Sequence, residues 1–223
     1  MMTQRPVDRL ILKLAIPTII SMTITAMYNL ADSYFIGHLS THATAGVGIA
    51  FAYQSFIQAI GFFFGSGSGN YISRALGAKK EQNAEKMAST GFFSALLAGI
   101  AIGLAGLIFI KPLATLLGAT PDIESYAIDY LKYLLIAAPF MISQMVLNNQ
   151  LRLQGNASQA MIGLVSGAII NIILDPIFIF VFDMGVSGAA LATILSQAIS
   201  CIWVLSFLCG KKTLLKLKIV YKK

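Results

Sequence analysis

Long apolar segments alternate with short polar stretches along the whole chain. Six of these segments reach the length of a membrane-crossing helix, since about 20 mainly apolar residues span the hydrocarbon core of a bilayer. Their apolar runs are longer than those of helices in a soluble core. The predicted spans are residues 14–36, 43–72, 87–110, 130–151, 157–182 and 186–209. The pattern therefore predicts an all-α integral membrane protein, a bundle of six transmembrane helices.

Composition agrees with a membrane protein. Hydrophobic residues make up 57% of the 223 residues and charged residues 11%, whereas a soluble domain carries about 25% charged residues. The mean hydropathy is +0.78. So much apolar surface has to face lipid, which argues against a soluble enzyme or a soluble binding domain.

The basic residues fall mainly on one side of the predicted bundle. Most of the 16 Lys and Arg residues lie before the first span, in the loops after the second and fourth spans, and in the C-terminal tail. The opposite loops carry only Lys111 and Lys132. By the positive-inside rule we expect a protein of the cell inner membrane with both termini in the cytoplasm. Attraction to anionic lipid headgroups accounts for the net charge of +7, so no nucleic-acid partner is expected.

Two carboxylates interrupt the apolar spans: Asp32 in the first and Asp175 in the fifth. A carboxylate at membrane depth costs about 2.5–3.5 kcal/mol on insertion scales and is normally kept for a function. A pair that only holds helices together is the structural alternative. We favour a site that takes up a cation or a proton.

The depths of the polar residues predict that they meet. Asp32 lies about 27 Å along the first span and Asp175 about 22 Å along the fifth, which places both in the outer half of the bilayer. Thr193 reaches the same layer from the sixth span, and Asn171 lies one turn from Asp175. The carboxylate, amide and hydroxyl oxygens of Asp32, Asn171, Asp175 and Thr193 are hard ligands that suit Na⁺, or H⁺ after protonation.

Prolines and glycines mark positions where the spans bend or pack closely. Pro17 and Pro176 each remove a helix hydrogen bond, and Pro17 lies four turns before Asp32, so a bend there would move the carboxylate. In the second span Gly61, Gly65 and Gly69 recur every fourth residue. Such a row lets helices approach closely in lipid, and a sliding surface is the alternative.

Several motifs resemble those of one transporter family, the multidrug and toxic-compound extrusion (MATE) family. They are Arg152-Leu-Gln-Gly-Asn156, then Asn171-Ile-Ile-Leu-Asp175-Pro-Ile-Phe, and Pro17 followed by Asn29-Leu-Ala-Asp32-Ser-Tyr-Phe-Ile-Gly37. The resemblance implies twelve helices in two lobes, of which residues 1–209 are the N-terminal lobe. Residues 210–223 would be a basic cytoplasmic tail that begins the linker between the lobes.

The resemblance also implies a function. Such proteins exchange Na⁺ or H⁺ for organic, often cationic drugs, with no other cofactor. The implied cation site is again Asp32, Asn171, Asp175 and Thr193, supported by Tyr28, Pro17 and Pro176. The second lobe is expected from a missing C-terminal half or from a second chain. For the drug cavity we expect Met and aromatic side chains, with candidates Met22, Met27, Phe140, Met141 and Met145.

Three alternatives differ from an antiporter. An intramembrane aspartyl protease would carry Tyr-Asp and Gly-x-Gly-Asp signatures, which neither Asp32 nor Asp175 provides, so we expect no enzyme. A non-transporting fragment or assembly partner would confer no drug resistance alone. A flippase for lipid-linked oligosaccharides should carry basic residues inside its cavity, and the sequence shows no Lys or Arg well inside a span.

Overall fold

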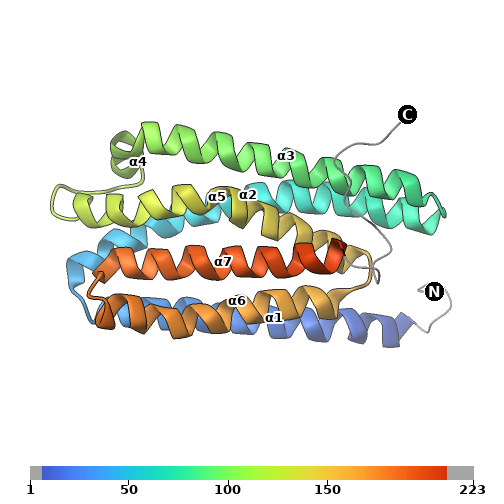
Figure 1. Ribbon diagram of the computed structural model, residues 1–223, viewed down its shortest axis with the longest axis horizontal. Coiled ribbons are helices and arrows are strands. Elements are labelled where there is room, and N and C mark those ends of the chain that lie inside the picture. Colours follow the sequence, from blue (N-terminus) through green and yellow to red (C-terminus); the bar gives the residue numbers. More distant parts are fainter. Residues whose placement is uncertain (1–6, 210–223) are drawn as a thin grey trace.

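The structure is a computed structural model that describes residues 7–209, and this part of the chain is helical without strands. The predicted basic tail, residues 210–223, lies outside the described residues. The elements are α1 (Val7–Gly37), α2 (Thr41–Gly77), α3 (Glu81–Ile108), α4 (Ile110–Leu116), α5 (Glu124–Leu153), α6 (Ala157–Pro176), the π-helix η2 (Ile177–Val181) and α7 (Gly185–Cys209). Each predicted span corresponds to one long helix, and the long helices extend along one common axis (Figure 1).

The long helices cross the bundle in alternating directions. Figure 1 shows that α1 begins and α7 ends at the same end of the bundle, where the α2–α3 and α5–α6 turns also lie. We call this the N-terminal end. The short helix α4 lies at the opposite end and was not predicted. Helix α3 ends at Ile108, and after the single cap residue Phe109 the chain starts a new helix at Ile110.

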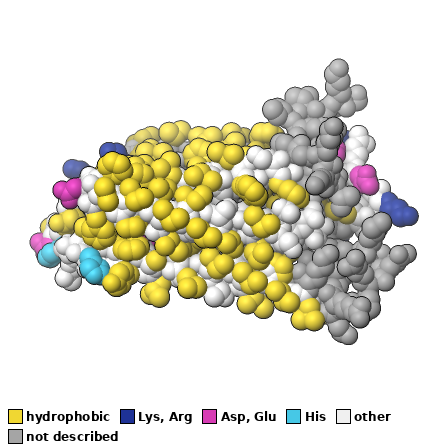
Figure 2. Space-filling model, turned by 60° about the horizontal axis from the view of Figure 1, so that its bottom comes forward, with side chains coloured by type: hydrophobic (Ala, Val, Ile, Leu, Met, Phe, Trp, Pro, Cys, Tyr) yellow, Lys and Arg dark blue, Asp and Glu magenta, His cyan; other side chains and the backbone are white. Residues whose placement is uncertain are grey.

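The surface fits a bilayer. Five helical stretches are long and apolar enough to cross a membrane, namely α2, α3, α5, α6 with η2, and α7. Helix α1 has 31 residues and packs alongside α6. On the face shown in Figure 2, hydrophobic side chains form a broad band, and the visible charged and histidine side chains lie toward its two ends. The chain is therefore a multi-pass membrane protein.

Helix α5 is the centre of the packing, because it contacts α2, α3 and α7. The glycines of α2 permit its close approach. A Cβ atom on Gly61 or Gly69 would lie 2.9 Å from Met145 or 2.3 Å from Leu153, both on α5. Real Cβ contacts are longer, so a side chain at residue 61 would force Met145 and its helix to shift, whereas at residue 69 the end of the Leu153 side chain could turn away. The close-packing interpretation of this row of glycines is confirmed.

The prolines act differently from one another. Helix α1 continues through Pro17, which is buried. Helix α6 instead ends at Pro176, and the chain continues as η2, in which the Phe182 N–H donates to the Ile177 carbonyl at 2.9 Å. Proline has no N–H to donate to the carbonyl one turn earlier, so Pro176 interrupts the hydrogen-bond ladder close to the point where the helix type changes. Asp175 thus lies at the junction of two helix types.

Candidate functional site

Helices α1 and α6 bring the two intramembrane carboxylates together. The two helices lie side by side and run in the same direction (Figure 1). Phe35 of α1 and Phe180 of η2 contact edge to face, with ring centroids 6.3 Å apart. Asp32 and Asp175 come shortly before these rings in their helices, so they lie at the same level. They are close enough to interact electrostatically.

The four predicted ligands form one buried cluster. Asp32 is 3% exposed and Asp175 is 0% exposed, and Asn171 and Thr193 are also buried. The Asn171 Nδ2 donates to Asp175 Oδ1 at 3.2 Å and to Thr193 Oγ1 at 3.4 Å. Side chains of α1, α6 and α7 therefore meet at one level of the bundle, as the depth argument predicted.

A fifth member, Tyr130, was missed by the sequence reasoning. It is buried on α5, and its hydroxyl donates to Asp32 Oδ2 at 3.4 Å. The same hydroxyl lies near Thr193. Tyr130 thus closes the cluster from the central helix. A tyrosine at the start of a predicted span is usually assigned to the membrane interface, so no signal in the sequence separated it.

Three oxygen atoms of this cluster have no hydrogen-bond partner within the described residues: Asp32 Oδ1, Asn171 Oδ1 and Asp175 Oδ2. A buried acceptor without a partner costs about 1–3 kcal/mol, and more when it is charged. No basic side chain compensates either carboxylate in this part of the chain. The oxygens fit a small hard cation, which can coordinate all three, or a proton shared between two of them.

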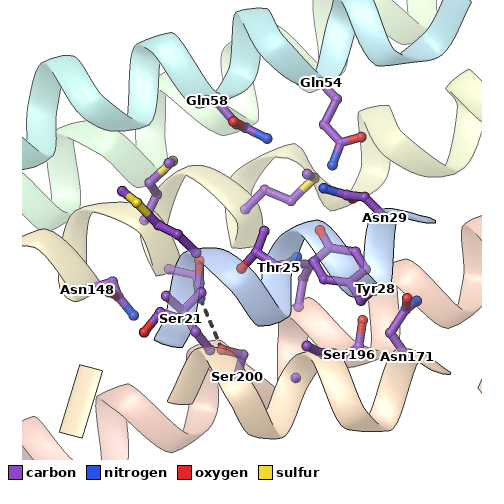
Figure 3. Close-up of a pocket in the computed structure, with 18 of the residues that line it drawn as sticks. Ser21, Thr25, Tyr28, Asn29, Gln54, Gln58, Asn148, Asn171, Ser196 and Ser200 are labelled. Atoms are coloured by element: carbon purple, nitrogen blue, oxygen red, sulfur yellow. Dashed lines mark hydrogen bonds between the residues drawn. The ribbon is translucent and has the colours of Figure 1, made fainter. Parts of the chain in front are cut away.

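A cavity of about 330 Å³ adjoins the cluster (Figure 3). Its walls come from α1, α2, α5, α6 and α7. Tyr28 and Asn171 line it; Asn171 is hydrogen-bonded to Asp175, and Tyr28 lies one turn before Asp32 on α1. These two residues connect the carboxylates to the cavity, although the carboxylates themselves do not line it.

The cavity wall is richer in amides than expected. Of the predicted lining residues Met22, Met141 and Met145 are present, whereas Met27 and Phe140 are not part of the wall. The amide side chains of the wall are Asn29, Gln54, Gln58, Gln144, Asn148, Asn149, Asn171 and Gln197. Three of the five candidate residues thus line the cavity, and the many amides beside them were not predicted. Amides one turn apart within apolar spans, such as Gln144 and Asn148, were the available signal.

Arg152 is placed differently from the prediction. The sequence reasoning assigned it to a loop, but it lies in the last turn of α5, half-buried, and lines the cavity. Among the described residues of the wall it is the one basic side chain, and no Asp or Glu lines the wall. Arg152 follows the predicted span 130–151 directly, so the statement that no Lys or Arg lies well inside a span stands. Its place in the cavity wall, however, removes the reason given against a flippase.

Comparison with known proteins identifies the family. The MatE family profile matches residues 17–177, which contain both carboxylates, Asp32 and Asp175. The chain belongs to the MatE family. It is 34% identical over 210 residues to the multidrug export protein MepA of Staphylococcus haemolyticus, covering 94% of this chain and 46% of the relative. MepA of Staphylococcus aureus strain MRSA252 is 32% identical over 199 residues, covering 89% of this chain and 44% of the relative.

Solved MatE structures share the fold. A structure described as MATE in the bent conformation matches with a TM-score of 0.89 and 33% identity, covering 95% of this chain and 48% of that one. One described as MATE in the straight conformation has the same TM-score and identity, covering 94% and 47%. The chain spans about half the length of the MatE relatives it matches, and it has the fold of a transporter lobe.

Proposed function

We propose that this chain is the N-terminal lobe of a cation-coupled multidrug antiporter, which exchanges H⁺ or Na⁺ for organic, often cationic compounds. One observation carries the proposal. Two buried carboxylates from separate helices, with unpaired oxygens, adjoin a cavity large enough for part of a drug molecule. Relatives that are named multidrug export proteins support the same function.

In the proposed cycle a cation binds among Asp32, Asn171, Asp175 and Thr193. Its charge relieves the repulsion between the carboxylates and uses the unpaired oxygens. Tyr28 and Asn171 then move, and they change the cavity wall. Drug and cation prefer different conformers, and this preference couples their binding.

Helix α1 is the proposed moving element. Related structures are described as bent and as straight, and Pro17 weakens the hydrogen-bond ladder of α1. A bend at Pro17 would displace Tyr28 and Asp32 together, because both follow it on the same helix. The bend would narrow the cavity and favour release of the drug.

A second lobe completes the proposed transporter. Alternating access needs two halves that rock against each other, and this lobe provides one wall of the central cavity. We place the N-terminal end of the bundle in the cytoplasm because the basic loops lie there. The partner lobe would come from further sequence after Lys223 or from a second chain.

The proposal is tested by exchanging one carboxylate. The gene that encodes this chain is expressed in a pump-deficient strain, and drug efflux is measured under an imposed H⁺ or Na⁺ gradient. Asp32→Asn should abolish gradient-driven efflux, while Asp183→Asn, in an exposed turn, should leave it unchanged. Efflux at the wild-type rate in Asp32→Asn would contradict the site. Lack of efflux in the strain that expresses the wild-type chain would favour the non-transporting alternative.

A further inference from the structure

The cavity has an uneven charge distribution that the proposed antiport does not use. Arg152 contributes a positive charge to its wall, and no carboxylate lines it within the described residues. We infer that the cavity recognises ligands that carry an acidic group, a carboxylate, sulfonate or phosphate, and that Arg152 binds this group. The inference rests on the proposed function and narrows the ligand class of the same cavity: where an exported compound also carries a cationic group, that group lies away from Arg152.

The position of Arg152 fits an elongated ligand. Met141 and Arg152 both line the cavity, and a separation of eleven residues along one helix places them about 16 Å apart. Arg152 lies toward the N-terminal end of the bundle, because it is in the last turn of α5. Tyr28 and Asn171, beside the carboxylates, mark the other end of the cavity. An acidic group at Arg152 would leave the rest of the ligand between the methionines and amides.

The surroundings of Arg152 leave its guanidinium free to bind an anionic group of a ligand. The guanidinium is half-buried and is not paired with a carboxylate of the described residues. A planar guanidinium binds carboxylate, sulfonate or phosphate oxygens through two parallel hydrogen bonds, and partial desolvation strengthens them. A cationic ligand group would instead be repelled at this position.

Two amides near Arg152 add hydrogen-bond donors. Asn148 and Asn149 line the same wall one turn before Arg152. The Asn148 Nδ2 donates to the Ala160 carbonyl at 3.0 Å, and the Asn149 Nδ2 donates to the Met145 carbonyl at 3.0 Å. Because an amide nitrogen has two N–H groups, each keeps a second donor for ligand oxygens. One charge and two neutral donors are a suitable set for an anion.

The test compares two probes that differ by one acidic group. The full chain is placed in phosphatidylcholine nanodiscs and titrated with 1-anilinonaphthalene-8-sulfonate and with the uncharged N-phenyl-1-naphthylamine. Arg152→Gln should weaken binding of the sulfonate about tenfold and leave binding of the uncharged probe within about twofold. Arg74→Gln is the matched control, since it removes a charge from the last turn of α2 at an exposed position outside the wall.

A further variant separates the loss of charge from misfolding, and two competition experiments identify the source of the anionic ligand. Arg152→Lys keeps the charge but loses the planar fork, so it should weaken sulfonate binding by only a few fold. Phosphatidylglycerol in the nanodisc would compete with the sulfonate if the natural ligand is a lipid headgroup. If the natural ligand is a free organic acid, soluble naphthalenesulfonate would compete and phosphatidylglycerol would not.

The outcomes distinguish the two proposals. Equal sulfonate affinity in the wild type, Arg152→Gln and Arg74→Gln would overturn the acidic-group inference, even where the uncharged probe still binds the cavity. Binding of neither probe to the wild-type chain would overturn ligand binding by the cavity, and with it the proposed antiport.

Discussion

Tyr130 of α5 donates a hydrogen bond of 3.4 Å to Asp32 of α1, although 98 residues separate them in the sequence. This bond links the central helix to α1, whose main packing partner is α6. It fixes one oxygen of Asp32 and leaves the other unpaired. The first carboxylate is thus oriented by the core of the bundle as well as by its own helix.

Replacement of Tyr130 by Phe should destabilise the chain. The substitution removes a donor to a buried carboxylate, which costs about 1.5–3 kcal/mol when the acceptor is charged. Thermal unfolding in detergent measures the loss. Tyr133→Phe is the control on the same helix, at a half-buried position outside the cluster, and should change stability little. Equal melting temperatures for Tyr130→Phe and the wild type would show that the hydrogen bond does not stabilise the chain.

A methyl group at Gly103 should disturb the contact between α3 and α5. A Cβ there would lie 2.5 Å from the Leu135 carbonyl oxygen, which is backbone and cannot rotate away. Gly103→Ala should therefore destabilise by about 1–3 kcal/mol, the usual cost of overpacking. At Gly67 nothing lies within 4 Å, so Gly67→Ala should be neutral or stabilising. A melting temperature for Gly103→Ala as high as that for Gly67→Ala would contradict the packing.

Replacement of Pro17 by Ala should separate cation binding from transport. Alanine restores the missing hydrogen bond of α1 and removes the weak point at which we propose that the helix bends. Gradient-driven efflux should fall at least about tenfold, a barrier change of about 1.4 kcal/mol. Cation affinity, measured by calorimetry on the purified chain, should stay within twofold. Unchanged efflux would show that α1 does not bend at this residue.

The bundle and its carboxylate cluster could be predicted because intramembrane charges stand out against apolar spans. The depth of Asp32 and Asp175 follows from helix rise alone, and the structure brings both together with Asn171 and Thr193. These predictions needed only the direction of each helix and its starting residue.

The remaining features depend on which way side chains face. Tyr130 could belong to the interface or to the core, and only the packing of α5 against its neighbours decides. Arg152 follows an apolar span directly, so the sequence gives no reason to continue the helix past it or to turn it inward. The amide wall arises from several helices at once, and a count of residue types along one span does not reveal it.

The number of cation sites tests the central claim most directly. Cation binding to the purified chain is measured by ²²Na⁺ scintillation and by proton uptake for the wild type, Asp32→Asn, Asp175→Asn and the double variant. If both carboxylates form one site, each single substitution removes all bound cation, and the double variant loses nothing more. Cation that remains in each single variant, and disappears only when both carboxylates are replaced, would contradict a shared site.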